Sequence, residues 1–324
     1  VSCRKYPLAL FNGSYLGREP TGIGVVARDL VAAIDPELVS LLDPLSGTRA
    51  GSIPIRNDLK PNCGTKGHLR RLIWTQSKVP TLLKQSGAQI FLSPLPEAPL
   101  FRGVKSVVLV HDLLPLRFPQ LTPLLAYHLT YVPLVLHRAE RVLCNSEATA
   151  REVHSRLGIP SRKLIKIPLG FDQDKLCPLD LLREPFFLIL GRHDPHKNIS
   201  RALHAFSLIR ENEFQLWLVG PQDRRYTPRL KKIANELGIE KRCRWIPWVS
   251  DEERHKLLNR CQALLITSLW EGFGLPALEA MACETPVISS SAGALPEVVS
   301  DAAIVVDPRN PFEIADAMVQ VSSD

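Results

Sequence analysis

The stretch LITSLWEGFGLPALEAMACETP, residues 265–286, decides the fold that we predict for this chain. Leu264, Leu265 and Ile266 predict a buried strand, and the residues from Glu271 to Gly274 predict a glycine loop. A helix is expected to open at Pro276, because proline at the first helical position costs no hydrogen bond. The helix must end before Pro286. The order strand, glycine loop, helix predicts a βα turn.

Two carboxylates lie eight positions apart in this stretch, Glu271 on the loop and Glu279 in the first turns of the helix. A helix N-terminus offers unpaired N–H groups to an anion or a sugar oxygen. Gly272 and Gly274 let the backbone approach a ligand closely. The stretch therefore favours a polyhydroxylated ligand with negative charge, such as a nucleotide-sugar. The alternative is a βα turn whose glycines serve packing alone.

Composition indicates an ordinary globular protein of two domains. The chain has 324 residues, of which 45% are hydrophobic and 23% are charged. No apolar run is long enough to span a membrane, and no signal peptide is visible, although the chain begins at Val1. The seven cysteines are scattered without metal-ligand spacing. We interpret them as reduced thiols of a cytoplasmic protein.

Positive charge is concentrated in the first half of the chain. Residues 1–175 hold 23 Lys and Arg against 13 Asp and Glu, whereas residues 176–324 hold 17 against 20. A basic first half could face anionic lipid, nucleic acid or a phosphorylated acceptor. The alternative is the basic solvated surface of an ordinary enzyme.

The first half opens with a strand predicted over Tyr6–Phe11, a glycine-containing loop and a helix from Val25 to about Ile34. The loop contains Gly22 and Gly24 but lacks the third glycine of the dinucleotide fingerprint. Dinucleotide binding is therefore not favoured, while contact with a phosphate or a sugar is expected. The next segment, residues 41–67, is rich in Pro, Gly, Asp and Asn and predicts an exposed loop.

A basic helical segment interrupted at Pro80 is predicted over His68–Gln85. Its apolar stripe is expected to pack against the sheet, with contact to a membrane surface as the alternative. The stripe consists of Leu69, Leu72, Ile73, Leu82 and Leu83.

Alternating strands and helices continue to the end of the first half. The strands are predicted at 89–93, 106–110, 141–145 and 164–168, with helices over 124–138 and after Ser146, which we expect to be an N-cap. His111 and Asp112 follow the second of these strands directly. Open α/β sheets place ligand-binding groups at such carboxyl ends, so both residues are candidates for a site.

We place the linker between domains at Leu169–Pro185, which has strong turn chemistry and no long apolar run. A second alternation of strands and helices follows it. The predicted domains are residues 1–172 and 173–324, and the fold class is α/β, with two Rossmann-like domains whose parallel sheets face each other across a cleft.

Arg192 and Lys197 lie just beyond the first strand of the second domain, in a turn that contains Pro195. A guanidinium binds phosphate oxygens in a bidentate way, and an ammonium adds a point charge. Such a pair suits a departing nucleoside diphosphate, because it fixes positive charge where negative charge develops. The alternative is that both are surface charges.

Several of these motifs together resemble glycosyltransferase family 4, whose members are retaining enzymes of the GT-B fold. In the second half they are GRHDPHKN (191–198), WVSDEE (248–253), SLWEGFGLPALEAMACETPVI (268–288) and LPEVVSDAAIVVDP (295–308). TGIG (21–24), HDLLPLRFP (111–119) and NSEATAREV (145–153) resemble the acceptor domain, particularly of bacterial mannosyltransferase-like members. The resemblance covers nearly the whole chain.

The resemblance implies a donor site built largely by the second domain. Arg192 and Lys197 would hold the diphosphate, Glu271 would contact the donor sugar hydroxyls, and Glu279 would bind the ribose. The backbone of Gly272, Phe273, Gly274 and Leu275 would cradle sugar and phosphate, Trp248 and Val249 would lie at the base, Gly22 and Gly24 at the phosphates, and His111 near the transferred sugar.

The resemblance also implies a reaction. A sugar would pass from a nucleotide-sugar, with GDP-mannose as our first choice and UDP-glucose as the second, to a hydroxyl of a glycan, a lipid-linked sugar or a small molecule. Retention would follow from attack on the face that the diphosphate leaves, with a donor phosphate oxygen accepting the proton and no protein nucleophile. The family needs no metal or other cofactor. Peripheral contact with the cytoplasmic face of a membrane, through the basic first half, is expected as well.

The chain departs from the family pattern at three places. His193 and His196 flank the cationic turn, and Ala292, Gly293 and Ala294 occupy a loop that often holds polar sugar contacts. The chain also ends inside a predicted helix, so the last crossover helix is expected to be missing. Two other function classes stay open: a GT-B subunit that binds a partner without catalysis, and nucleic-acid binding, which no stacking-aromatic motif supports.

Overall fold

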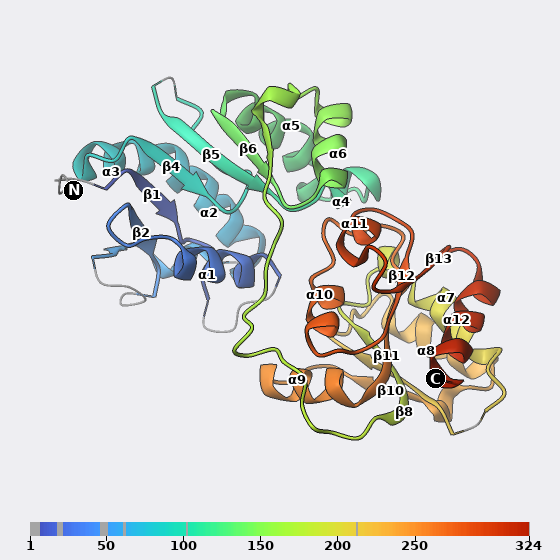
Figure 1. The fold of residues 1–324 in the computed structure, drawn as a ribbon. Coiled ribbons are helices and arrows are strands. Elements are labelled where there is room, and N and C mark those ends of the chain that lie inside the picture. Colours follow the sequence, from blue (N-terminus) through green and yellow to red (C-terminus); the bar gives the residue numbers. More distant parts are fainter. Residues whose placement is uncertain are drawn as a thin grey trace. The chain divides into compact units, whose positions relative to one another are not determined.

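The structure is a computed structural model that describes residues 7–17, 22–45, 51–60, 63–101, 103–211 and 213–323. The chain divides into two compact units, Val1–Pro168 and Leu169–Asp324. Each unit is a parallel sheet with helices on both faces (Figure 1). The predicted α/β class with two Rossmann-like units is therefore confirmed.

The sheet of the first unit has seven parallel strands in the order β3-β2-β1-β4-β5-β6-β7. The order reverses direction between β1 and β4, which makes their carboxyl ends the expected place for ligand groups. The strands are β1 (Ala9–Asn12), β2 (Val39–Asp43), β3 (Ile53–Pro54), β4 (Ile90–Ser93), β5 (Lys105–Val110), β6 (Arg141–Cys144) and β7 (Leu164–Lys166).

The helices of the first unit follow the predicted segments closely. They are α1 (Ile23–Ala33), α2 (Gly64–Ser77), α3 (Val79–Ser86), α4 (Leu114–Arg117), α5 (Pro123–Arg138) and α6 (Glu147–Leu157), with short 3-10 turns at Asn57–Leu59 and Ser161–Lys163. Ser146 is the N-cap of α6, and its hydroxyl accepts a hydrogen bond from the backbone N–H of Thr149, as predicted.

Two predictions for the first unit are wrong. Residues 41–67 are not one exposed loop, because the strands β2 and β3 pair within this segment, at Leu42 with Ile53. The apolar stripe is misplaced in its first part, because Leu69 and Ile73 are exposed while Arg71 and Trp74 are buried. Its second part is confirmed: Leu82 and Leu83 of α3 pack against the core of the unit. Arg71 lies on the buried face of α2, so the helix packs with a different face inward from the one that the hydrophobic pattern predicts. The ion-pair partner of Arg71 is described below.

The sheet of the second unit has six parallel strands in the order β10-β9-β8-β11-β12-β13, again with a reversal, between β8 and β11. The strands are β8 (Glu184–Leu190), β9 (Gln215–Val219), β10 (Cys243–Ile246), β11 (Cys261–Ile266), β12 (Val287–Ser290) and β13 (Ile304–Val306). The helices are α7 (Ile199–Ser207), α8 (Thr227–Glu236), α9 (Asp251–Arg260), α10 (Leu275–Ala282), α11 (Leu295–Val299) and α12 (Pro311–Ser323), with 3-10 turns at Pro195–Lys197 and Glu240–Arg242.

Strand periodicity explains how each sheet builds two cores. Successive side chains of a strand point to opposite faces, so Phe187 joins the core under α7, α8 and α12 while Phe186 and Leu188 join the core beside α9 and α10. Leu10 and Phe11 separate in the same way in the first unit. Burial on both faces explains why these strands read as continuous apolar runs in the sequence.

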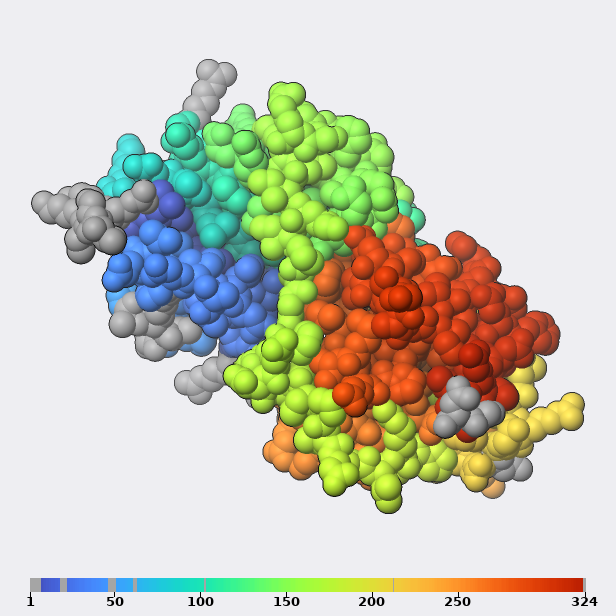
Figure 2. All heavy atoms as spheres, viewed as in Figure 1, coloured from blue at the N-terminus to red at the C-terminus, as the bar shows by residue number. Residues whose placement is uncertain are grey.

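The segment that joins the units, residues 169–183, runs along the surface in Figure 2, with Leu176 as its buried anchor. In the described part of the chain no helix has the length and apolarity that a membrane crossing requires. The six cysteines within the described residues carry free thiols.

Candidate functional site

The turn after β8 brings the backbone of two neighbouring strands into close contact at the carboxyl edge of the second sheet. Gly191 has a φ of 136° and donates its N–H to the carbonyl of Val219. A Cβ on Gly220 would lie 2.1 Å from the carbonyl oxygen of Gly191. Only glycine at position 220 allows this approach, which fixes the start of the turn that carries Arg192 and Lys197.

Lys197 and Glu271, predicted from separate motifs, are in direct contact. The Lys197 Nζ lies 2.6 Å from the Glu271 Oε1, and the Ser268 hydroxyl donates a hydrogen bond to the same oxygen at 2.6 Å. Both side chains are partly buried, with exposed fractions of 20% and 14%. Burial alone raises the pKa of the Glu271 carboxyl, but Lys197 and Ser268 outweigh it and hold the pKa below its usual value. Glu271 is therefore a charged carboxylate at neutral pH.

Hydrogen bonds between side chains and backbone carbonyls join the turn that carries Lys197 to the loop that carries Glu271. The hydroxyl of Thr267 donates to the carbonyl oxygens of Lys197 and Asn198. The side-chain amide of Asn198 donates a hydrogen bond to the carbonyl of Thr267. The backbone of Asn198 has a φ of 54°. These hydrogen bonds fix the spacing of the two loops that carry Lys197 and Glu271.

The glycine loop presents its backbone at the start of α10. Gly274 is the N-cap of the helix with a φ of 108°, where a side chain would be strained and would meet Leu295. Gly293 packs against the same loop from the next βα turn: its Cβ would lie 2.5 Å from the carbonyl oxygen of Glu271, and Ala294 donates its N–H to that oxygen. The departure at residues 292–294 therefore has a packing role.

Arg192 projects from the turn with 65% of its side chain exposed, and its Nε lies 3.3 Å from a carboxylate oxygen of Asp194. The two flanking histidines turn inward. His193 is buried, with its Nδ1 2.8 Å from the Thr227 hydroxyl and its ring edge-on to Trp245. Burial lowers the pKa of both His193 and His196, so both imidazoles are neutral at pH 7. Positive charge in this turn thus comes from Arg192 and Lys197.

Glu279 lies on the side of α10 that faces α9. Its Oε1 is 3.2 Å from Nη1 of Arg254, and only 7% of the residue is exposed. The second guanidinium nitrogen of Arg254 lies 3.5 Å from Asp251 at the start of α9. Arg254 was missed in the sequence, because nothing in its own helix distinguishes it from the other charged residues there.

Trp248 and Val249 precede α9 and have opposite environments. Trp248 is 69% exposed, whereas Val249 packs against the core beside β8 and β11. The exposed indole is suited to stacking on a planar ring, and the partly buried valine anchors the loop that carries it.

In the first unit, Gly22 and Gly24 lie at the start of α1. Gly22 is the N-cap, with a φ of 49°, and Gly24 is buried in the first turn. The preceding residues 18–21, including Thr21 of the TGIG motif, lie outside the described residues.

His111 follows β5 and contacts the loop after β4, with its Nε2 2.8 Å from the carbonyl oxygen of Pro94. Burial lowers the pKa of His111 to about 4, so the ring is neutral at pH 7. A neutral ring that faces a carbonyl with Nε2 must carry its proton there, which makes Nδ1 the hydrogen-bond acceptor. The carbonyl of His111 itself accepts a hydrogen bond from Asn145.

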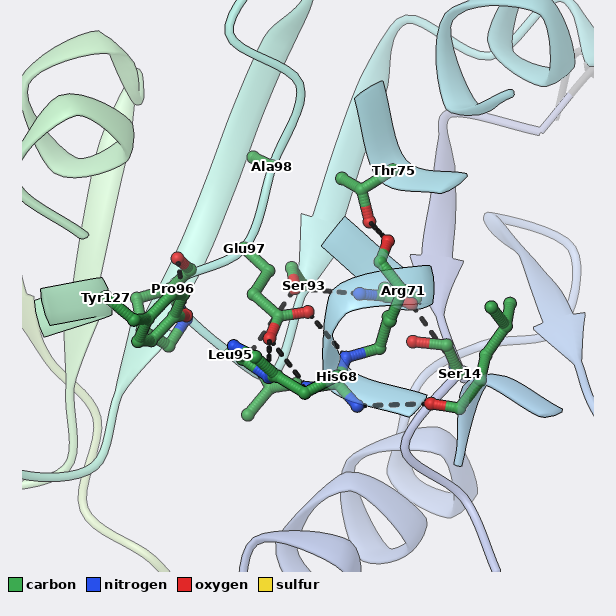
Figure 3. A network of polar contacts seen from close by, with 12 residues as sticks. Ser14, His68, Arg71, Thr75, Ser93, Leu95, Pro96, Glu97, Ala98 and Tyr127 are labelled. Atoms are coloured by element: carbon green, nitrogen blue, oxygen red, sulfur yellow. Dashed lines mark hydrogen bonds and ion pairs between the residues drawn. The ribbon is translucent and has the colours of Figure 1, made fainter. Parts of the chain in front are cut away.

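The same loop carries a buried ion pair that sequence reasoning missed (Figure 3). Arg71 of α2 donates two hydrogen bonds to Glu97, from Nε to Oε2 and from Nη2 to Oε1, both at 2.7 Å. A third donor, Nη1, reaches the carbonyl of Leu59. Glu97 is the single acidic residue between Asp58 and Asp112, which is the one sequence signal that could have drawn attention to it. The pair explains why α2 turns Arg71 inward.

Aromatic side chains surround this pair. The Arg71 guanidinium lies 5.1 Å from the Tyr15 ring centre, and Tyr127 packs edge-on against His68. Burial raises the pKa of Tyr15 and Tyr127 and lowers that of His68, so all three rings are neutral at pH 7. The carboxyl edge of the first sheet therefore has no net charge around the Arg71–Glu97 pair.

Metal chemistry was not expected from the sequence. Among the described residues, no group of three or more His, Cys, Asp or Glu side chains has an arrangement that could hold a metal ion.

Two family models match the chain, one on each unit. The model for Glycosyltransferase Family 4 matches residues 21–175, and the model for Glycosyl transferases group 1 matches residues 180–324. Together they span almost the entire chain.

Curated relatives include several bacterial mannosyltransferases. An MMP alpha-(1->4)-mannosyltransferase of Mycolicibacterium hassiacum is 36% identical over 191 residues, which is 56% of this chain and 44% of that protein. The O-antigen chain mannosyltransferase B of Escherichia coli is 27% identical over 237 residues, 68% of this chain and 62% of that protein. The chain thus spans less than two thirds of the length of these relatives.

Solved structures share the fold over the whole chain. Anabaena HepE in complex with UDP and glucose has a TM-score of 0.75 at 20% identity, covering 98% of this chain and 90% of that one. WaaG, a glycosyltransferase of lipopolysaccharide biosynthesis, has a TM-score of 0.73 at 13% identity with the same coverage. At these identities the likeness bears on the fold alone, and it confirms the predicted GT-B type.

The contact between Lys197 and Glu271, the glycine loop that opens α10 and the two family matches lead to one conclusion: the chain belongs to glycosyltransferase family 4, with its group 1 domain in the second unit.

Proposed function

We propose that this chain transfers a hexose from a nucleotide-sugar to an acceptor hydroxyl, with retention of configuration at the transferred carbon. The observation that carries the proposal is the Lys197–Glu271 contact at 2.6 Å, placed beside the backbone N–H groups at the start of α10. A carboxylate that is held charged by an ammonium accepts hydrogen bonds from sugar hydroxyls, and the helix N-terminus favours phosphate. One edge of a sheet thus offers both halves of a nucleotide-sugar a partner.

Each predicted donor residue has a role in this proposal. Lys197 and the exposed Arg192 bind the diphosphate and stabilise it as it leaves, while Glu271 orients the sugar. Glu279 binds the ribose, and Trp248 covers the base. The backbone of residues 272–275 lines the sugar and the phosphates, with Val249 as the anchor of the base loop. Gly22 and Gly24 lie at the phosphates.

His111 acts as a hydrogen-bond acceptor in this scheme. Its Nε2–H donates a hydrogen bond to the carbonyl of Pro94, so Nδ1 accepts a hydrogen bond from a hydroxyl of the transferred sugar. Because the ring stays neutral at pH 7, it adds no charge beside the anomeric carbon. The proton of the acceptor hydroxyl passes to an oxygen of the leaving diphosphate, and no side chain forms a covalent bond to the sugar.

The donor that we propose is GDP-mannose. Support comes from the relatives whose names state mannosyl transfer, in Mycolicibacterium and in Escherichia coli. A UDP-glucose-type donor, used with a small or lipid acceptor, is the alternative.

A donor panel tests the proposal directly. The protein is incubated with GDP-mannose, GDP-fucose, UDP-glucose and UDP-galactose, with methyl mannoside or water as acceptor, and released nucleotide and new glycoside are measured by mass spectrometry. We expect GDP release from GDP-mannose above the rate without enzyme, and an α-configured product by NMR. If the protein binds nucleotide but turns over no donor, the chain is a binding subunit of GT-B fold, the alternative from another class.

We also propose that the first unit binds peripherally to the cytoplasmic face of an anionic membrane. There the protein would reach a lipid-linked acceptor. Two observations support this: exposed apolar side chains occur on α2, at Leu69 and Ile73, and on α5, at Leu129 and Leu134, and α2 also carries the exposed Arg70. Flotation with vesicles of anionic and neutral lipid checks it, and equal recovery with both would exclude electrostatic attachment. Nucleic acid is not a partner in this scheme.

A further inference from the structure

Arg254 holds the carboxylate to which the proposed function gives the ribose. It lies in the second turn of α9, and its Nη1 reaches Glu279 Oε1 on α10 at 3.2 Å. The residue that it pairs with is nearly buried, so an unpaired carboxylate there would be costly. The contact therefore does more than a surface ion pair, which contributes little.

The geometry of Arg254 indicates that its two carboxylate partners, Asp251 and Glu279, determine where its guanidinium lies. Its Nε is buried without a hydrogen-bond partner among the described residues, although such groups are normally satisfied. Its Nη2 lies 3.5 Å from the exposed Asp251, which is in the first turn of the same helix. The side chain thus gives up a hydrogen bond at Nε while it keeps its guanidinium between Asp251 and Glu279.

The helix that carries Arg254 also connects two parts of the proposed donor site. Ser250 caps α9, and the two residues before it are Trp248 and Val249. Arg254 therefore ties the helix that follows the base loop to the helix that carries the ribose carboxylate. A guanidinium fixed on Oε1 holds that oxygen in place and so sets the direction of the other carboxylate oxygen of Glu279.

We propose that Arg254 is a positioning residue for ribose recognition: it acts through Glu279, and it sets how strongly the protein prefers a ribonucleotide to a 2′-deoxyribonucleotide. This rests on the proposed function, because it takes Glu279 as the ribose-binding group. Arg254 itself does not touch the substrate in this scheme.

The test is a ratio of affinities measured by isothermal titration. The probe is GDP or UDP, whichever binds the wild-type protein more tightly, together with its 2′-deoxy counterpart. We expect the wild-type protein to prefer the ribonucleotide by about tenfold, since one hydrogen bond to a charged group is lost in the deoxy form. Arg254→Met should reduce this preference to about threefold or less. Arg254→Lys should restore part of it.

Three further variants separate positioning from general damage. Glu279→Gln should lose the preference for the ribonucleotide. The double variant Arg254→Met/Glu279→Gln should show the same affinity ratio as Glu279→Gln alone, because Arg254 acts through Glu279. Lys256→Met is the matched control on the same helix, where Lys256 pairs with the exposed Glu252. It should keep the wild-type ratio. Thermal unfolding of each variant shows whether a lost ratio accompanies a lost fold.

The outcomes distinguish this inference from the function on which it rests. If the wild-type protein binds neither nucleotide, the donor site itself is wrong. If it binds and prefers the ribonucleotide, but Arg254→Met keeps the full preference while Glu279→Gln loses it, the positioning role is overturned. Tighter ribonucleotide binding by Arg254→Met would also overturn it, because the arginine would then be a competitor for Glu279.

Discussion

The two sheets carry ion pairs at their carboxyl edges, but the pairs differ in exposure. In the first unit, Arg71 and Glu97 are sealed from solvent and joined by two short hydrogen bonds. In the second unit, Lys197 and Glu271 are partly open, and Arg192 is mostly exposed. A sealed pair has nothing left for a ligand, whereas an open pair can exchange its partner for phosphate or hydroxyl groups. The comparison assigns the anion chemistry of the donor to the second unit, while the Arg71–Glu97 pair of the first unit has a structural role.

The largest expected effect is on stability in the first unit. Arg71→Met leaves the buried Glu97 carboxyl without its ion-pair partner, which should destabilise the unit by about 4 kcal/mol. Hydrogen exchange measures the two units separately, and protection should fall in β1, β4 and α2 only. Arg70→Met is the control, because Arg70 is exposed and its partner Asp58 is 3.6 Å away. Equal effects at both positions would contradict the contrast between sealed and open pairs.

A slightly smaller effect is expected on catalysis in the second unit. Lys197→Ala or Glu271→Ala should lower turnover at least about a hundredfold, on the order of 3 kcal/mol, because each removes charge that is placed for the transition state. The rate of donor consumption measures this. Ser268→Ala, which removes one hydrogen bond to the same carboxylate oxygen, should cost less than either. Unchanged rates in both main variants would remove these roles.

Acid should affect the first unit through its buried histidines. Burial and the neighbouring His68 lower the pKa of His128 to about 4, as burial does for His111. The unfolded chain takes up protons below about pH 6.5, while the folded rings stay neutral until about pH 4. Their contribution is therefore complete above pH 6.5 and is lost as the pH falls through this window, by up to about 3 kcal/mol for each ring. Urea titrations from pH 7 to 4.5 measure it, and His128→Gln should flatten the slope.

The glycine at position 293 provides a smaller test of the second unit. Gly293→Ala brings a Cβ to the backbone of Glu271 at a φ of 67°, which should cost about 2 kcal/mol of stability and displace the carboxylate. Gly17→Ala is the control, because its Cβ would have no atom within 4 Å. Thermal unfolding and turnover together measure the effect. A variant as stable and active as the wild type would mean that the loop has room to adjust.

The smallest effect is expected at the exposed indole. Trp248→Ala should weaken nucleotide binding by about 1 kcal/mol, since a stacking partner for the base is lost while the partly buried Val249 still anchors the loop. Titration with GDP measures the change, and Trp217→Phe, a partly buried position in β9, is the comparison. No change at Trp248 would place the base elsewhere.

Features that depend on residues close together in the sequence were predicted, whereas contacts between residues far apart in the sequence were not. Strands buried on both faces are long apolar runs, and the Lys197–Glu271 site belongs to two short motifs, so both were recognisable locally. The pairs Arg71–Glu97 and Arg254–Glu279 were not, because each joins residues that only tertiary packing brings together. The burial of Arg71 also explains the wrong face assigned to α2. Strands β2 and β3 were missed because turn residues dominate the composition around them.

Titration of GDP and of UDP into the wild-type protein and into Lys197→Ala tests the central claim most directly. The account predicts that GDP binds with a dissociation constant well below about 1 mM and that Lys197→Ala weakens it at least about tenfold. If neither nucleotide binds the wild-type protein below about 1 mM, the donor site assigned to the second unit is contradicted.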